Sequence, residues 1–481
     1  MCTFVNKLNN LIVNLKQKSS GFVYSFFLPL VSSLFVLLFW IANLQIIGLL
    51  VIVLITSFVL IVYDDLLPIV SLMFMVPMVF RDTTYAFENQ LVYCIIIFAI
   101  LVLALIFHFI KYPIKKLEFD KFFFVILAIV GIFLIGGLFS GDCIHYFDGI
   151  GIFLMSGIVP LVIHLVFYNK VKTDTKIDIR KYLCIGFIIA ISLASMELCF
   201  AKLHVSIYGK GAYKPIPGGF CWANSNHIAS LVLIAVPLCC YMMLSSKRIL
   251  AWLIELSFLY LTLYLSGSDG AFATLGVFTP FLMLVVYKNV YKYNLKKLKL
   301  VFSIIISIAV IVLAYLCLFE FSVLLDFITS SSNSTGRELP YKMSIKTFLS
   351  YPIFGIGLGG GNAALNSVKD ILDYNGFYHS TFFHILACTG GVGIIGYVIY
   401  YLARMRYLLN KNSVLGSFAL YAFIMFALYG LIENNEFNIV LLFMTTLITI
   451  VGLINKKGSD DKPLPLWVKN PIFYHVYQSC K

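Results

Sequence analysis

The chain consists of long apolar blocks separated by short polar connectors. Within blocks such as 46–62 and 301–319, apolar residues follow one another without the alternation that a lipid-facing β-strand shows. Each block has about 20 residues, which lets a helix cross the ~30 Å hydrocarbon core of a bilayer. The pattern therefore predicts a polytopic, all-α membrane protein.

We expect about 14 membrane-spanning helices of this length. Their approximate ranges are 22–40, 45–63, 67–80, 91–110, 122–140, 149–168, 182–201, 226–245, 249–265, 271–287, 301–319, 381–403, 414–432 and 437–455. The third range is the shortest, and without it the sidedness of every later connector would be reversed.

Basic residues test this count, because Lys and Arg gather in the cytoplasmic connectors of membrane proteins. With the N-terminus placed in the cytoplasm, most of the 35 basic residues fall in cytoplasmic connectors or in the two termini. These connectors include Lys111, Lys116, Lys170, Lys247 and Arg404. The distribution supports an even number of spans, with both termini in the cytoplasm.

This topology leaves two outer loops, 202–225 and 320–380, and the second precedes the third-last helix. We divide the chain into an N-terminal transmembrane bundle (1–201), a second transmembrane region that carries both loops (202–455) and a cytoplasmic tail (456–481). The 320–380 loop is much longer than an ordinary connector. We therefore expect the function to reside there.

Composition narrows the class of protein further. Hydrophobic residues make up 61% of the chain and charged residues 12%, against about 25% charged residues in soluble domains. The net charge of +13 does not indicate nucleic-acid binding, because the basic residues are spread over short connectors. The 11 cysteines lie mostly inside apolar blocks and show no metal-binding spacing, so we expect no metal site.

The 320–380 loop contains three candidate features. Pro340 and Pro352 would bracket a short helix at the outer surface, with Lys342 and Lys346 one turn apart on it. A glycine-rich segment, 352–361, is either a flexible turn or a place where backbone amides approach an anion. His379 follows at the mouth of the next helix, where a base can meet both lipid and water.

The order of these elements resembles the O-antigen ligase and polymerase superfamily of membrane glycosyltransferases. The resemblance extends from about residue 218 to 452. It rests on Arg337, on Tyr-Pro-Ile-Phe-Gly-Ile-Gly at 351–357, on His379-Ser380, on Thr-Gly-Gly-Val-Gly at 389–393 and on Gly-Phe-Cys-Trp-Ala-Asn-Ser-Asn-His-Ile-Ala at 219–229. The chain departs from the family pattern at Ser225, which replaces a proline, at Asp269, which replaces an arginine, and at Ser380, which replaces an asparagine.

The resemblance implies a GT-C-like helical bundle that transfers a glycan from a polyprenyl-diphosphate carrier, such as undecaprenyl diphosphate, on the outer face of the cytoplasmic membrane. In this scheme His379 is the general base and Arg337 neutralises the leaving diphosphate. The scheme requires no metal or other cofactor. The expected substrate contacts are Lys210, Lys214, Asn226, Asp269 and Lys342.

Several alternatives stay open at this point. A polymerase would extend another lipid-linked glycan and a ligase would modify a lipid core, and no residue separates the two. A lipid-linked oligosaccharide flippase also fits the number of spans, although the sequence shows no paired halves. A peptidoglycan-type glycosyltransferase of the shape-and-division family would use an acidic base such as Asp269. The resemblance further suggests a flippase and a chain-length regulator as partners.

Overall fold

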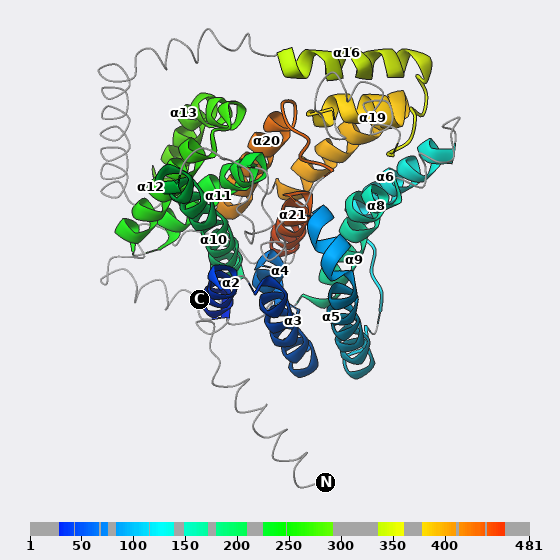
Figure 1. Ribbon diagram of the computed structural model, residues 1–481. Coiled ribbons are helices and arrows are strands. Elements are labelled where there is room, and N and C mark those ends of the chain that lie inside the picture. Colours follow the sequence, from blue (N-terminus) through cyan, green and yellow to red (C-terminus); the bar gives the residue numbers. More distant parts are fainter. Residues whose placement is uncertain are drawn as a thin grey trace, which may run out of the picture.

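The computed structural model describes residues 28–42, 44–66, 69–75, 83–114, 116–138, 149–171, 179–208, 225–246, 248–291, 335–359, 378–409, 413–437 and 440–456. Every regular element in these ranges is helical, and none is a strand (Figure 1). This confirms the all-α prediction.

The helices follow the apolar blocks closely. They are α2 (Leu28–Ile41), α3 (Gln45–Val62), α4 (Val70–Met75), α5 (Thr83–Lys111), α6 (Lys121–Leu138), α8 (Ile150–Phe153), the π-helix η4 (Leu154–Ile158), α9 (Val159–Lys170), α10 (Ile179–Tyr208), α11 (Ser225–Ser245), α12 (Ile249–Ser266), α13 (Asp269–Tyr291), α16 (Thr335–Ser350), α19 (Thr381–Leu408), α20 (Val414–Tyr429) and α21 (Val440–Lys456). A helix lies over every predicted span except 301–319, which is outside the described residues.

Three helical stretches are long and apolar enough to cross a bilayer: Asn226–Ser245, Ile249–Ser266 and Thr381–Leu408. Shorter apolar helices accompany them, including Val414–Tyr429 and Val440–Asn455. These helices indicate a membrane protein. The full number of spans, the side on which each loop lies and the division into domains stay predictions.

Helix α11 forms the centre of the second half of the molecule. It packs against α10, α12, α13 and α20, and 94% of its apolar stretch is buried. A helix that is apolar on all sides belongs inside a bundle. Helix α11 begins with polar residues, of which Asn226 and His227 are partly buried, so the packing of α11 brings these two side chains to the end of the bundle.

Helix α19 is broken at Gly390, where φ is 63° and ψ is −158°. A break inside a bilayer leaves backbone groups that only protein can satisfy. The Pro-Ile-Phe-Gly-Ile-Gly segment satisfies them on both sides of the break. The amides of Ile356 and Gly357 donate to the carbonyls of Ala387 and Cys388, at 3.1 and 2.9 Å.

In return, the amides at 391 and 392 donate to the carbonyls of Pro352 and Ile353, at 2.8 and 3.1 Å. A Cβ atom on Gly355 would lie 2.4 Å from the backbone of Cys388, which explains the glycine there. Residues 352–356 form a turn, and the amides of 355, 356 and 357 all donate to protein carbonyls, so in this structure these three amides face protein and not an anion.

Helix α16 lies across the start of α19 (Figure 1). It begins at Thr335 and contains Pro340, whereas the sequence predicted that Pro340 would stand near its start. Proline removes one helical hydrogen bond, but here Pro340 and Ser344 are buried. Packing against α19, with the hydroxyl of Ser344 donating to the carbonyl of Phe383 at 2.6 Å, therefore offsets the missing bond.

Two basic residues assigned to cytoplasmic connectors lie inside the bundle instead. Lys170 is 6% exposed, and its ammonium group lies 3.4 Å from a carboxylate oxygen of Asp64. Arg404 is 0% exposed and is paired with Glu436. Both residues lie in helices rather than in connectors, because α9 and α19 extend beyond the predicted spans, and each cation has a buried or half-buried acidic partner. Their placement on the cytoplasmic side stays a prediction.

Candidate functional site

A buried polar segment joins α20 to α21. Residues 430–437 are not helical, and Glu433, Asn434, Asn435 and Glu436 are 3%, 6%, 0% and 1% exposed. Four consecutive polar side chains inside an apolar bundle need hydrogen-bond partners, because burial without them is unfavourable. Their partners define the candidate site.

The carboxylate of Glu433 joins three distant parts of the chain. Its Oε1 atom lies 3.2 Å from Nδ1 of His379, and its Oε2 atom accepts a hydrogen bond of 2.7 Å from Nδ2 of Asn226. The backbone amide of Asn434 also donates to Oε1, at 3.2 Å. The structure thus brings His379 and Asn226 together through a residue that the sequence analysis did not identify.

The protonation of this pair follows from the surroundings of Glu433. Burial raises the pKa of the Glu433 carboxyl, but the hydrogen bond and charge of His379, with the amide of Asn434, lower the pKa below its usual value. The carboxylate is therefore ionised near neutral pH and can only accept hydrogen bonds. Nδ1 of His379 therefore donates to this carboxylate, so in the neutral form of the ring Nε2 is the nitrogen that can accept a proton.

The backbone of His379 is strained. Its φ of 44° is the only positive value at a non-glycine among the described residues. Such strain persists only where the surrounding structure enforces it, and it is common at functional sites. The side chain of His379 is 33% exposed, whereas that of Glu433 is 4% exposed. The histidine can therefore reach a substrate while its partner stays buried.

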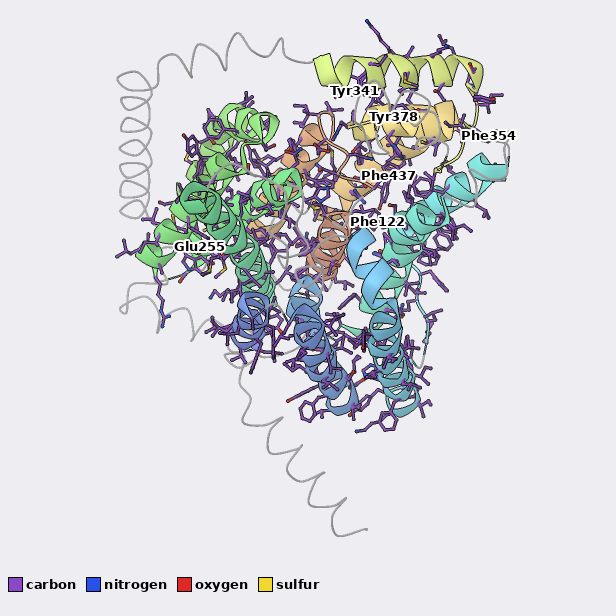
Figure 2. The ribbon with its side chains drawn as sticks, viewed as in Figure 1. Phe122, Glu255, Tyr341, Phe354, Tyr378 and Phe437 are labelled. Carbon is purple, nitrogen blue, oxygen red and sulfur yellow. The ribbon has the colours of Figure 1, made fainter. Side chains whose placement is uncertain are left out.

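Helix α16 and the start of α19 enforce this backbone conformation. The hydroxyl of Tyr341 donates to the carbonyl oxygen of His379 at 3.3 Å, and its ring stacks on Phe383 with 4.2 Å between centroids. Figure 2 shows Tyr341 on α16 above α19, with Tyr378 at the beginning of α19. Ser380 caps α19 by accepting from the amide of Phe383. Serine and asparagine are both good N-caps, so Ser380 preserves this role where the family has asparagine.

Asn435 holds the polar segment in place. Its Oδ1 accepts from the hydroxyl of Ser230 at 2.8 Å, and its Nδ2 donates to the carbonyl of Phe426 at 3.2 Å. Its amide donates to the hydroxyl of Thr381 at 3.1 Å. Because these partners belong to α11, α20 and α19, the position of Glu433 is fixed by three helices.

The other predicted site residues are described only in part. The backbone of Arg337 lies in the first turn of α16, one turn before Tyr341, but its side chain is outside the described residues. The side chain of Asp269 is also outside them, as are Lys210 and Lys214 entirely. Lys342 is exposed on α16. The roles of these residues stay predictions.

The sequence analysis missed Glu433 and Asn435. The available signal was the run Glu-Asn-Asn-Glu at 433–436, which separates two apolar blocks and contains no basic residue. His384, which sequence spacing excluded from a shared ligand site with His379, is fully buried, with its ring 4.4 Å from that of Phe437. Within the described ranges, no group of three or more His, Cys, Asp or Glu side chains is placed to hold a metal ion.

Comparison with known proteins agrees with the motifs. Residues 254–398 match the model of the family described as O-antigen ligase. The match runs from within α12 into α19 and includes Arg337 and His379, but it ends before Glu433. No curated protein matches the chain. The match confirms the resemblance to the O-antigen ligase and polymerase superfamily and supports a membrane glycosyltransferase of that general type.

Proposed function

We propose, from the match to the O-antigen ligase family and from the His379–Glu433 pair, that this protein joins lipid-linked oligosaccharide units on the outer face of the cytoplasmic membrane. The product would be an O-antigen, capsule or exopolysaccharide. The observation that carries the proposal is a half-exposed histidine whose Nδ1 is held by a buried carboxylate. In this arrangement Nε2, the other ring nitrogen, is the atom that can act as a base.

In the proposed reaction, Nε2 of His379 takes the proton of an acceptor sugar hydroxyl as its oxygen attacks the anomeric carbon of the donor. The bond between that carbon and the diphosphate breaks, and the diphosphate leaves on its lipid carrier. Glu433 stabilises the imidazolium that forms, as a carboxylate does beside a catalytic histidine. The proton then passes from His379 to solvent.

Arg337 is the proposed partner of the leaving diphosphate, because a guanidinium group suits phosphate oxygens and stays charged. Lys210, Lys214 and Lys342 are secondary candidates for that contact, and Asp269 is a candidate for sugar hydroxyls. Asn226 donates to Glu433, so we assign it the orientation of the carboxylate in addition to its predicted substrate contact.

Polymerase and ligase both remain compatible with this chemistry. The predicted number of spans favours a polymerase, which would transfer the growing glycan to another lipid-linked unit. A ligase would transfer it to a lipid core. A flippase that delivers the donor and a chain-length regulator are the proposed partners.

A lipid-linked oligosaccharide flippase is the second candidate, and two observations favour it. Helix α19 is broken, and the non-helical segment 430–437 carries two buried acidic residues. Transporters often place charged residues on broken helices inside the bundle. The His379–Glu433 pair lies at the start of α19, and the sequence shows no paired halves of the kind that transporters have. Both points favour the transferase.

The variant His379→Ala tests the assignment. We expect it to abolish glycan extension in cells at normal levels of the protein in the membrane, because loss of a general base reduces rates by about 10²–10⁴-fold. His475→Ala, in the predicted tail, is the matched control. The measurement is the length distribution of the surface glycan on a gel.

Each outcome is distinct. A ladder that collapses to one repeat indicates a polymerase, and polymer retained on its carrier lipid indicates a ligase. Unflipped repeat units that accumulate on the inner leaflet indicate a flippase. A ladder of unchanged length in His379→Ala would show that the histidine is not the base.

A further inference from the structure

The segment that carries Glu433 contains a second buried carboxylate, which faces another part of the molecule. Oε1 of Glu436 lies 2.7 Å from Nη1 of Arg404, and the two side chains are 1% and 0% exposed. Glu433 and Glu436 are three residues apart in the same non-helical stretch. One contacts the candidate site, and the other contacts the second half of α19.

The guanidinium of Arg404 is held on several sides. Its Nη2 donates to the hydroxyl of Tyr400, and its central carbon lies 3.8 Å from the centre of the Tyr400 ring. The ring of Phe423, on α20, lies 5.6 Å away. Arginine presents its donors in a rigid planar fork, so a carboxylate bound to it has a defined position and direction.

Stability alone does not explain a buried ion pair. The loss of hydration largely cancels the attraction, and apolar residues of similar size often stabilise a protein as well or better. A buried pair can instead select one arrangement of the chain among several. Residues 434–437 need such selection, because the helical hydrogen bonds that continue from α20 end at the amide of Glu433, which donates to the carbonyl of Tyr429 at 2.9 Å.

We infer that Arg404 and Glu436 are positioning residues that hold Glu433 against His379. This inference rests on the proposed function. The segment is attached to α19 at its start, through Thr381, and in its second half, through Arg404. The amide of Thr381 donates to the carbonyls of Gly430 and Glu433 at 2.8 and 3.3 Å, and its hydroxyl accepts from the amide of Asn435 at 3.1 Å. Arg404 binds Glu436, at the other end of the segment.

The two attachment points lie on opposite sides of the break at Gly390. The Arg404–Glu436 pair therefore couples the angle of the broken helix to the position of the carboxylate. His379 directly precedes the first half of α19, so a change in this angle would move the histidine relative to Glu433. The interior of the bundle thus determines the geometry of the proposed base.

The test replaces both charges at once, in the variant Arg404→Met/Glu436→Leu. This variant leaves no unpaired charge, so we expect normal membrane levels and an unchanged thermal midpoint. We expect kcat to fall by about 10–100-fold, because a misplacement of about 1 Å at a reactive group can cost about 100-fold. KM for the lipid-linked substrate should stay within about twofold, since neither residue contacts substrate in this scheme.

Asp64→Leu/Lys170→Met is the matched control, because it removes another ion pair that lies in the N-terminal helices. It should leave kcat unchanged. Arg404→Lys is the second variant: it keeps the charge but loses the fork, so kcat should again fall. If the double variant proves unstable, Arg404→Lys decides the question in its place.

Full kcat in a stable Arg404→Met/Glu436→Leu protein, or in Arg404→Lys, would overturn the positioning role. His379→Ala and Glu433→Gln are assayed in parallel with purified protein and lipid-linked repeat units. They distinguish failure of the positioning inference from failure of the proposed function. If both of those variants stay active, the proposed base itself is wrong. If they are inactive while the Arg404 variants are fully active, only the positioning inference fails.

Discussion

After His379, Glu433 is the residue on which the proposed chemistry depends most directly. Glu433→Gln keeps the size of the side chain but removes the charge that stabilises a protonated His379. We expect kcat to fall by at least about 100-fold with little change in KM. The control is Glu255→Gln, because Glu255 bonds to Ser192 on a different helix pair. The measurement is transfer of glycan between lipid-linked units by purified protein.

The same variant has a pH signature. The pKa of Glu433 lies below its usual value in the folded protein, so its ionised form stabilises the fold above about pH 4.5. That contribution is lost as the pH falls through the lowered pKa. Wild-type protein should therefore exceed Glu433→Gln in thermal midpoint at pH 7, and the difference should shrink below pH 4.5. A difference that grows toward acid pH would contradict the ionised state of Glu433.

Single residues were predictable where the local sequence contains the signal. His379 stands at the boundary of an apolar block, and Asn226 belongs to the 219–229 stretch that resembles the family, so both could be identified from the sequence. The run at 433–436 marks Glu433 as polar between two apolar blocks, but it does not identify the partners of Glu433, which lie 54 and 207 residues away. Its role depends on the packing of α11 and α19 around one non-helical turn, which hydrophobic periodicity does not describe.

At the scale of elements, backbone hydrogen bonds between residues 352–357 and residues 387–392 hold the break in α19 at Gly390. Gly390→Ala should destabilise the protein by about 1–3 kcal/mol, because alanine is strained at a φ of 63°. Its Cβ atom would also lie 2.5 Å from the carbonyl oxygen of Ile353. Activity should fall with stability, since His379 directly precedes α19.

Gly276→Ala is the matched control, because nothing lies within 4 Å of a Cβ atom there. Alanine is favoured over glycine in a helix by up to about 1 kcal/mol, so this variant should be as stable as the wild type or more stable. Thermal unfolding in detergent measures both. Equal midpoints for Gly390→Ala and the wild type would contradict the interlocked arrangement.

The apolar blocks predicted where helices lie, because a stretch of about 20 apolar residues leaves few alternatives in a membrane. They did not predict the break in α19 or the extension of α16 to Thr335. Both depend on contacts between elements. The break requires residues 352–357 to supply backbone partners, and α16 tolerates Pro340 because that residue is buried in packing.

At the scale of the whole molecule, the fold brings together two parts of the proposed site that are far apart in the sequence. The 320–380 loop supplies α16 and the segment that completes α19, while the turn between α20 and α21 supplies the carboxylate. The family match covers the first of these parts and ends before the second. We therefore expect the proposed site to be complete only when the last two helices are present.

The side of the membrane on which this site lies can be tested through α16, because Tyr341 of that helix bonds to His379. Lys346 is exposed on the same helix, and Lys116 is exposed in the connector between α5 and α6. The positive-inside rule places Lys116 in the cytoplasm and Lys346 outside. In intact cells, a membrane-impermeant maleimide should therefore label Lys346→Cys but not Lys116→Cys, and permeabilised cells should show both.

Because the chain has 11 native cysteines, labelling is scored against the wild-type protein in the same cells. Labelling of Lys116→Cys alone in intact cells would invert the topology and place His379 on the cytoplasmic side. A lipid-linked donor on the outer leaflet could not reach it there, because a diphosphate headgroup does not cross the hydrocarbon core unaided. Such a result would contradict the proposed transfer on the outer face of the membrane, whatever the activity of the His379 variants.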